Sequence, residues 1–331
     1  MKNRKELKNP IYSLQSSNLW RFKFIKKMFY RNLKVIFNFG QKLGIHIVPN
    51  HFYYPIPDTR KLDNRILSRQ TELVGININE EEQLELLDNF ERNYKSEFNK
   101  FPRFKTNIPY QYYTTNGNFK SVDGEILYSI IRNFKPKKVI EIGSGFSTYC
   151  SAVAIRKNKE KDRNYNCELI SIEPYPNDIL RKGFPELSKL IQKKVQDVPI
   201  EIFKSLNEND ILFIDSSHIV NVGNDVQYEF LEILPRLNKG VFIHVHDIFL
   251  PAEYPKYWYF KLFRFYSEQY ILQAFLTYND RFKIIWAGNF MKLKYQKKLE
   301  EVFDSLKQDF IELKTNDNID WPSSFWIQKI K

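Results

Sequence analysis

The chain has 331 residues, of which 43% are hydrophobic and 16% aromatic, and it carries a net charge of +12 at pH 7. This composition excludes a fibrous or largely disordered protein, and the length allows a catalytic domain with an appended region. No uninterrupted apolar stretch reaches the roughly 18 residues of a transmembrane helix. Lys and Arg recur through residues 21–34, so the N-terminus lacks the continuous apolar core of a secretory signal. We expect a cytoplasmic protein, with peripheral contact at the inner membrane surface left open.

The excess positive charge lies in the first 50 residues, which carry 11 basic side chains and one acid. Between residues 19 and 43 aromatic residues alternate with these charges, as in a basic amphipathic helix. Three roles remain open for this segment: contact with an anionic membrane, binding of nucleic acid, and packing on the rest of the chain. Nucleic acid is the least favoured partner. The first 60 residues could form a lid, an anchor or a dimer arm.

Upstream of the first strand, the pattern predicts an acidic amphipathic helix at residues 80–98 and a loop at 99–118. A second helix is predicted at 122–134, where Lys135 and Pro136 end it. The predicted organisation has three parts, which are an N-terminal extension at 1–60, a helical and loop cap region at 61–118, and an α/β domain at 119–331.

From residue 135, short β-branched runs alternate with helical stretches, which indicates a parallel α/β sheet. An aromatic segment at 254–278 and a charged helix at 292–313 separate the last strands from the others. Seven strands are predicted, at residues 138–142, 168–172, 191–195, 210–214, 240–245, 282–287 and 323–330.

A glycine turn follows the first strand and opens a helix, in the run Glu141-Ile142-Gly143-Ser144-Gly145. Glycines at such a turn let the backbone approach a ligand, and the start of the helix offers free N–H groups. Thr148 stands where a dinucleotide-binding pattern would have a third glycine. The turn therefore favours a smaller adenosyl ligand.

Two further acids follow the next predicted strands. Glu173 ends the second strand, where its carboxylate could accept both hydroxyls of a ribose. Asp197, in the run Gln196-Asp197-Val198, follows the third strand and could reach an adenine edge, although a structural role is open for each acid.

The fourth and fifth strands end in acids and histidines. Asp215 and His218 follow the fourth strand, while His244, His246 and Asp247 close the fifth, and the alternation of a strand places the last two histidines on one face. The carboxyl ends of parallel strands meet at one edge of a sheet. Carboxylates with imidazoles could bind a divalent cation, and a neutral imidazole could take a proton from a hydroxyl.

Over residues 105–331 these motifs and their order resemble the class I S-adenosylmethionine (SAM) methyltransferases. Within that family they are similar to a bacterial group of metal-dependent small-molecule and sugar O-methyltransferases. The resemblance implies an α/β fold with a Rossmann-like seven-stranded sheet, mostly parallel with the last strand antiparallel. Helices would cover both faces, and a helical or irregular N-terminal extension would precede them.

The resemblance also implies roles for the cofactor residues. Glu141, Gly143, Ser144 and Gly145 would lie against the methionine part of SAM. Glu173 would hold the ribose, and Asp197 would lie beside the adenine.

His218 matches the general base of the similar enzymes, and Asp215 lies beside it as a second catalytic residue. Asp215, His246 and Asp247 match positions that hold magnesium in those enzymes. An imidazole at residue 246 departs from the oxygen ligands that Mg²⁺ prefers. The site could therefore hold Mg²⁺, another divalent cation, or none.

The leading hypothesis is SAM-dependent O-methylation of a hydroxylated small molecule or sugar. The aromatic loop at 249–258 and the polar run at 267–270 would line the acceptor pocket. One alternative is a non-catalytic SAM-fold binding protein tethered to a membrane or partner. Another is a nucleic-acid methyltransferase, although Asp215-Ser216-Ser217-His218 lacks the Pro-Pro-aromatic run typical of enzymes that act on base amines. The acceptor and the oligomeric state are left open.

Overall fold

The computed structural model describes residue 28 and residues 31–313 and 321–331, in two compact units, Met1–Asp63 and Asn64–Lys331. The described part of the first unit contains helix α2 (Leu33–Lys42) and the 3₁₀ turn η1 (Thr59–Lys61). Of the predicted amphipathic helix at 19–43, residues 19–27, 29 and 30 lie outside the described residues, so membrane contact stays a prediction. None of the described helices is long and apolar enough to cross a bilayer.

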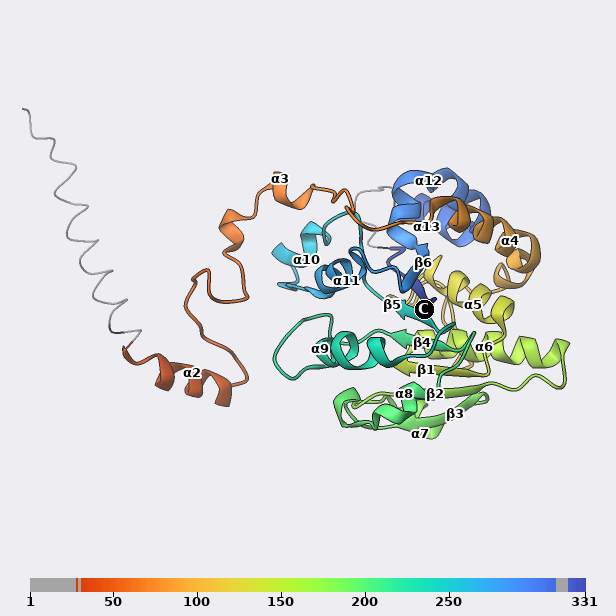
Figure 1. The fold of residues 1–331 in the computed structure, drawn as a ribbon, viewed down its shortest axis with the longest axis horizontal. Coiled ribbons are helices and arrows are strands. Elements are labelled where there is room, and N and C mark those ends of the chain that lie inside the picture. The colour runs from red at the N-terminus through yellow and green to blue at the C-terminus, as the bar shows by residue number, and fades with distance from the viewer. Residues whose placement is uncertain (1–27, 29–30, 314–320) are drawn as a thin grey trace, which may run out of the picture. The chain divides into compact units, whose positions relative to one another are not determined.

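The second unit is built on a seven-stranded sheet in the order β3-β2-β1-β4-β5-β7-β6 (Figure 1). Strands β1 to β5 are parallel, and β7 lies antiparallel between β5 and β6. The predicted fold class is therefore confirmed. The strands are β1 (Lys138–Ile142), β2 (Glu168–Ile172), β3 (Leu187–Ile191), β4 (Ile211–Ile214), β5 (Phe242–Val245), β6 (Phe282–Ala287) and β7 (Phe325–Lys329).

The order of the strands creates a crevice at the carboxyl ends of β1 and β4. The chain runs outward from β1 through β2 to β3 and then returns to β4 on the other side of β1. Connections on the two sides of such a point leave opposite faces of the sheet, so the strand ends remain open to a ligand. Both predicted clusters of functional residues follow strands at this place.

Apolar residues cover both faces of the central strands. Val139 of β1 joins one buried cluster while Ile140 and Ile142 join the other, because successive side chains of a strand point to opposite faces. A strand buried on both faces reads as a continuous apolar run, as expected for the middle of a parallel sheet.

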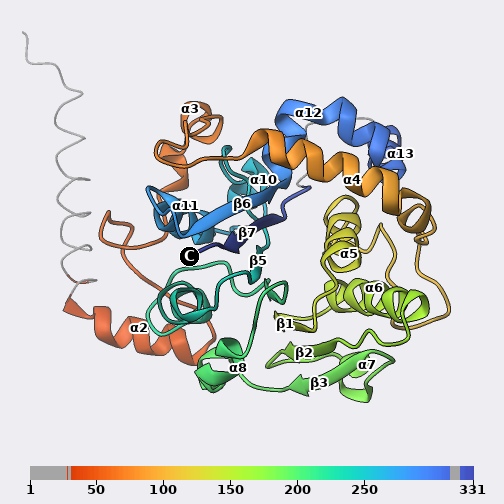
Figure 2. The same ribbon diagram turned by 45° about the vertical axis from the view of Figure 1, so that its right-hand side comes forward.

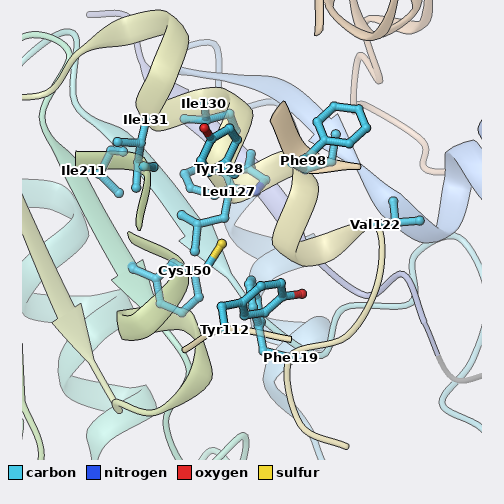
Figure 3. Close-up of a cluster of buried hydrophobic side chains, with 14 of the residues drawn as sticks. Phe98, Tyr112, Phe119, Val122, Leu127, Tyr128, Ile130, Ile131, Cys150 and Ile211 are labelled. Atoms are coloured by element: carbon cyan, nitrogen blue, oxygen red, sulfur yellow. The ribbon is translucent and has the colours of Figure 1, made fainter. Parts of the chain in front are cut away.

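Helices cover both faces of the sheet (Figure 2). Figure 3 shows the core on the first face, where Cys150 of α6 lies beside α5 and donates a 3.2 Å hydrogen bond to the Gly124 carbonyl. The helices on this face are α4 (Glu80–Phe98), α5 (Asp123–Phe134), α6 (Phe146–Lys161), α7 (Asp178–Lys182), α12 (Gly288–Val302) and α13 (Asp304–Leu313). The second face carries α8 (Ile200–Lys204), α9 (Asp225–Tyr228), the π-helical turn η3 (Glu229–Ile233) and α11 (Glu268–Leu276).

Two predicted elements differ from the structure. The third strand is Leu187–Ile191, not 191–195, because β3 is an edge strand whose Ser188 and Lys189 are exposed and interrupt the apolar pattern. Val195 is buried in the 3₁₀ turn η2 (Val195–Asp197) instead. The charged helix at 292–313 is two helices, α12 and α13, which meet at the fully buried Phe303.

Candidate active site

Gly143 brings the ends of β1 and β4 into contact. Its φ is +80°, and a Cβ at this position would lie 1.8 Å from the carbonyl oxygen of Asp215. Its amide donates a 3.0 Å hydrogen bond to the carbonyl of Ile172 at the end of β2. Only glycine fits this close approach and this conformation, so the turn fixes three strand ends at the crevice.

The rest of the turn faces open space. A Cβ on Gly145 would meet no atom within 4 Å, and Gly145 is among the residues that line a cavity of about 350 Å³. Its amide donates a 3.0 Å hydrogen bond to Oγ1 of Thr148, in the first turn of α6. The amide of Ser144 lies 3.4 Å from Oε2 of Glu173. The backbone between β1 and α6 is therefore exposed to a ligand, as the sequence predicted for a glycine turn.

Glu141 lies beneath this turn and lines neither of the cavities described here. Its side chain is fully buried, and Ser151 of α6 donates to Oε1 at 3.4 Å. Burial raises the pKa of this carboxyl to about 8. Glu141 therefore supports the start of α6 from below, and the structure does not place it against a ligand.

A second cavity, of about 420 Å³, adjoins the first and shares Gly143, Glu173 and Asp215 with it. Glu173 stands at the junction, where a ribose between an adenine and a methionine chain would lie. Gln196 lines the second cavity and Asp197 does not; the latter is exposed on η2. β3 ends at Ile191, earlier in the chain than predicted, and Gln196 is the residue of the Gln-Asp pair that lies at the cavity.

Acidic and histidine side chains from β4, β5 and α11 meet in the first cavity. His218 stands at the centre, with Nε2 3.3 Å from Oδ1 of Asp215 and 3.6 Å from Oδ2 of Asp247. Its Nδ1 lies 2.8 Å from Oε2 of Glu268. Nε2 of His246 lies 3.8 Å from Oδ1 of Asp247. Asp215, His218, His246 and Asp247 thus come together as predicted, and Glu268 joins them.

The backbone at two of these residues is strained. His218 has a φ of +60° and Asp247 a φ of +55°, which costs a non-glycine residue on the order of 1–3 kcal/mol. The carbonyl of His218 accepts hydrogen bonds from the amides of Ser267 and Glu268, at 2.9 and 3.2 Å. The start of α11 therefore holds both the backbone and the imidazole of His218 in place.

The carboxylates control the protonation of the histidines. Burial alone would lower the pKa of His218, but hydrogen bonds with Asp215 and Glu268 and the charge of Asp247 raise it well above its ordinary value. Burial would raise the pKa of Asp215, but the positive charges of the neighbouring imidazoles lower it to about 2. His246 also has a raised pKa, since Asp215 and Asp247 outweigh its burial. The carboxylates therefore favour the protonated form of His218.

His244 has a different environment from His246, although both rings lie on the same face of β5, 5.5 Å apart. It is fully buried, stacks on Phe213 at 3.9 Å, and has a pKa well below its ordinary value because of that burial and the neighbouring charge of His246. It is therefore a neutral core residue.

The predicted metal ligands, Asp215, His246 and Asp247, do not form a metal site in the structure. Within residues 28, 31–313 and 321–331, no group of three or more His, Cys, Asp and Glu side chains is arranged to hold a metal ion. The carboxylates of Asp215 and Asp247 converge on Nε2 of His218 instead.

An aromatic wall that the sequence only partly predicted completes the first cavity. Trp258 of α10 (Lys256–Phe260) lies in the predicted aromatic loop, whereas Arg264 and Tyr266 come from the segment between α10 and α11. Asp123 and Trp321 also line the cavity from distant parts of the chain. No local motif marks Asp123, Arg264, Tyr266 or Trp321 as cavity residues, because only the folded chain brings them beside β4 and β5.

Part of the chain matches a known protein family. A methyltransferase-domain family model matches residues 140–248, the span from β1 through Asp247. An uncharacterized protein of Archaeoglobus fulgidus is 37% identical over 178 residues, which cover 52% of this chain and 78% of the relative.

Among solved structures, the chain is similar to a Plasmodium falciparum protein described as a protein-L-isoaspartate O-methyltransferase in complex with S-adenosyl-L-homocysteine. The identity is 18% and the TM-score 0.29, with 49% of this chain and 82% of that chain covered. The domain match and the strand order β3-β2-β1-β4-β5-β7-β6, which is typical of the class I methyltransferase fold, identify the chain as a SAM-dependent methyltransferase.

Proposed function

We propose that this enzyme methylates a hydroxyl group of a small molecule or sugar, with His218 as the general base. The observation that carries the proposal is the arrangement of the imidazole, whose Nδ1 is held by buried Glu268 while Nε2 faces the cavity that the glycine turn also lines. A base whose far nitrogen is held by a carboxylate is the arrangement that activates hydroxyl nucleophiles in many enzymes.

The cofactor residues fit SAM in two respects. Gly145 leaves open space where a side chain would stand, and Glu173 presents its carboxylate at the junction of the two cavities. The turn at 143–145 would hold the methionine part, Glu173 the ribose, and Gln196 rather than Asp197 would lie near the adenine. When bound, SAM supplies a methyl group on a positively charged sulfur, and the C–S bond breaks with its electron pair left on that sulfur.

His218 and its neighbours would handle the proton of the acceptor. The hydroxyl gives its proton to Nε2 as its oxygen forms the new C–O bond with the methyl carbon. Glu268 accepts a hydrogen bond from Nδ1–H, which keeps Nε2 as the basic nitrogen. Asp215 and Asp247 then stabilise the imidazolium that forms, because both carboxylates face Nε2. The proton leaves to solvent before the next turnover.

Mg²⁺ at Asp215, His246 and Asp247 has no place in this mechanism. Mg²⁺ prefers six oxygen ligands in near-octahedral geometry, whereas the two carboxylates here are paired with His218 and the third group is an imidazole. The residues present therefore do not fit the ion, and we derive no step through it.

The test separates cofactor binding from proton transfer. The wild type and His218→Asn are compared by calorimetry with SAM and by transfer of a labelled methyl group to a panel of hydroxylated metabolites. General-base catalysis is worth about 10²- to 10⁴-fold, so we expect the variant to bind SAM normally and to lose at least about a hundredfold in kcat.

His46→Asn is the matched control, because this exposed histidine lies in the Met1–Asp63 unit. Full activity in the His218 variant would refute the assignment of the base. Transfer of the methyl group to nitrogen or carbon acceptors alone would refute O-methylation.

A further inference from the structure

We propose that the acceptor carries an anionic group, a carboxylate or a phosphate, that binds Arg264 while its hydroxyl reaches His218. This proposal rests on the proposed function and names the class of acceptor. It starts from the charged and aromatic groups that surround the base on the side away from the glycine turn.

Three side chains, Tyr266, Trp258 and Arg264, lead away from the base. The ring of Tyr266 lies over the imidazole of His218, with centroids 4.8 Å apart. Trp258 packs edge-on against Tyr266 at 5.1 Å. The guanidinium of Arg264 lies 5.8 Å from the ring of Trp258 and 5.9 Å from that of Tyr266. One aromatic ring therefore separates the cation from the base.

The charge of Arg264 is available to a ligand. Across the described ranges of the chain, the structure shows no ion pair between its guanidinium and a carboxylate, and its side chain is exposed at the cavity that Tyr266 and His218 also line. A guanidinium presents several N–H donors in a plane that matches carboxylate and phosphate oxygens. The two rings beside it limit where that plane can lie.

Two carboxylates disfavour an anion at the inner end of the cavity. Asp215 and Asp247 face His218 at the inner end, so an anionic group there would meet two like charges. At Arg264 it would meet an opposite charge. An acceptor with a hydroxyl and an acidic group about one ring apart, such as a sugar acid, a sugar phosphate or a hydroxybenzoate, satisfies both ends.

Aromatic walls suit such a ring. Trp258 is buried and Tyr266 half-buried, so both rings are held in position by packing. Flat ring faces of this kind pack against the C–H face of a sugar or against another aromatic ring. The acceptor wall thus provides an apolar face between a base and a cation.

The test uses acceptors in pairs that differ only in the acidic group: glucuronate and glucose 6-phosphate against glucose, and 3,4-dihydroxybenzoate against catechol. Each compound is measured by labelled methyl transfer and by calorimetric binding in the presence of S-adenosyl-L-homocysteine. We expect the wild type to favour at least one acidic member by about tenfold or more, from a charge-assisted hydrogen bond. The carboxylate and phosphate arms show which anion is preferred.

Arg264→Gln should remove that preference by raising KM or the dissociation constant for the acidic member, with SAM affinity unchanged. Arg264→Lys should keep part of it, because the charge remains without the planar geometry. Arg163→Gln changes an exposed arginine that does not line the cavity and should have no effect.

Equal behaviour of acidic and neutral members in every pair, in turnover and in binding, would overturn the proposal. So would a loss of SAM affinity in Arg264→Gln, since the cation would then belong to the donor site. A wild type that fails to bind SAM would instead refute the proposed function.

Discussion

Replacing Glu268 with Gln tests the part of the site that motifs in the sequence indicate least. The carboxylate is fully buried and its Oε2 lies 2.8 Å from Nδ1 of His218. Gln keeps the size of the side chain and removes the charge. A hydrogen bond to a charged group contributes about 1.5–3 kcal/mol, so its loss in the transition state lowers kcat by about ten- to hundredfold.

The same variant should change the pH dependence in a defined direction. Glu268 helps to raise the pKa of His218, and a base with a raised pKa gains its active neutral form only as the pH rises. Without the carboxylate, the pKa of His218 falls, so the alkaline rise in kcat/KM should move to lower pH even though the maximum is smaller. A purely structural residue would not produce this shift.

The assay measures initial rates of labelled methyl transfer across the pH range, with SAM affinity and thermal unfolding on the same samples. Glu232→Gln is the control, because Glu232 is exposed and forms its ion pair with Arg236, away from the cavities. Unchanged kcat and an unchanged pH profile in Glu268→Gln, in a folded protein, would refute the role given to Glu268.

Three further outcomes are expected. In the wild type, kcat/KM for the acceptor should rise with pH beyond the ordinary imidazole range, because the carboxylates favour the protonated form of His218. A pH–rate series measures this rise, and a plateau already at pH 6 would contradict it. Gly145→Val should weaken SAM binding by about tenfold or more while the thermal midpoint stays the same, because the new side chain enters open space in the cavity. Gly143→Ala should instead lower the thermal midpoint, because its Cβ meets the Asp215 carbonyl. Activity should survive a chelator; loss of activity that added Mg²⁺ restores would show that a cation is needed after all.

The central sheet could be predicted from the sequence because its strands are buried on both faces. The ranges predicted for β1 and β2 match the structure, and α4 begins and ends as its acidic amphipathic pattern indicates. The edge strand β6 was also predicted correctly, because buried and half-buried residues alternate along it. The edge strand β3 was predicted at the wrong residues, since Ser188 and Lys189 are exposed there and leave no periodic apolar pattern.

The candidate site divides in the same way. Asp215, His218, His246 and Asp247 could be grouped from the sequence, because each follows a strand whose end lies at the same edge of the sheet. The contact between His218 and Glu268 spans 50 residues and depends on how α11 docks. β3 ends at Ile191, earlier than predicted, and Gln196 rather than Asp197 lines the second cavity. Residue types alone do not show that His218 lies between the carboxylates of Asp215 and Asp247, so the sequence also allowed a metal site there.

The two halves of the crevice come from different stretches of the chain. The half proposed to bind the methyl donor lies within residues 140–248, which the family model matches, whereas Trp258, Arg264 and Tyr266 follow that span. Substitutions in the segment between α10 and α11 can therefore change which molecule is accepted without disturbing the glycine turn. Sequence differences among relatives should therefore accumulate in that segment, so that the same fold can methylate different acceptors when this one segment changes.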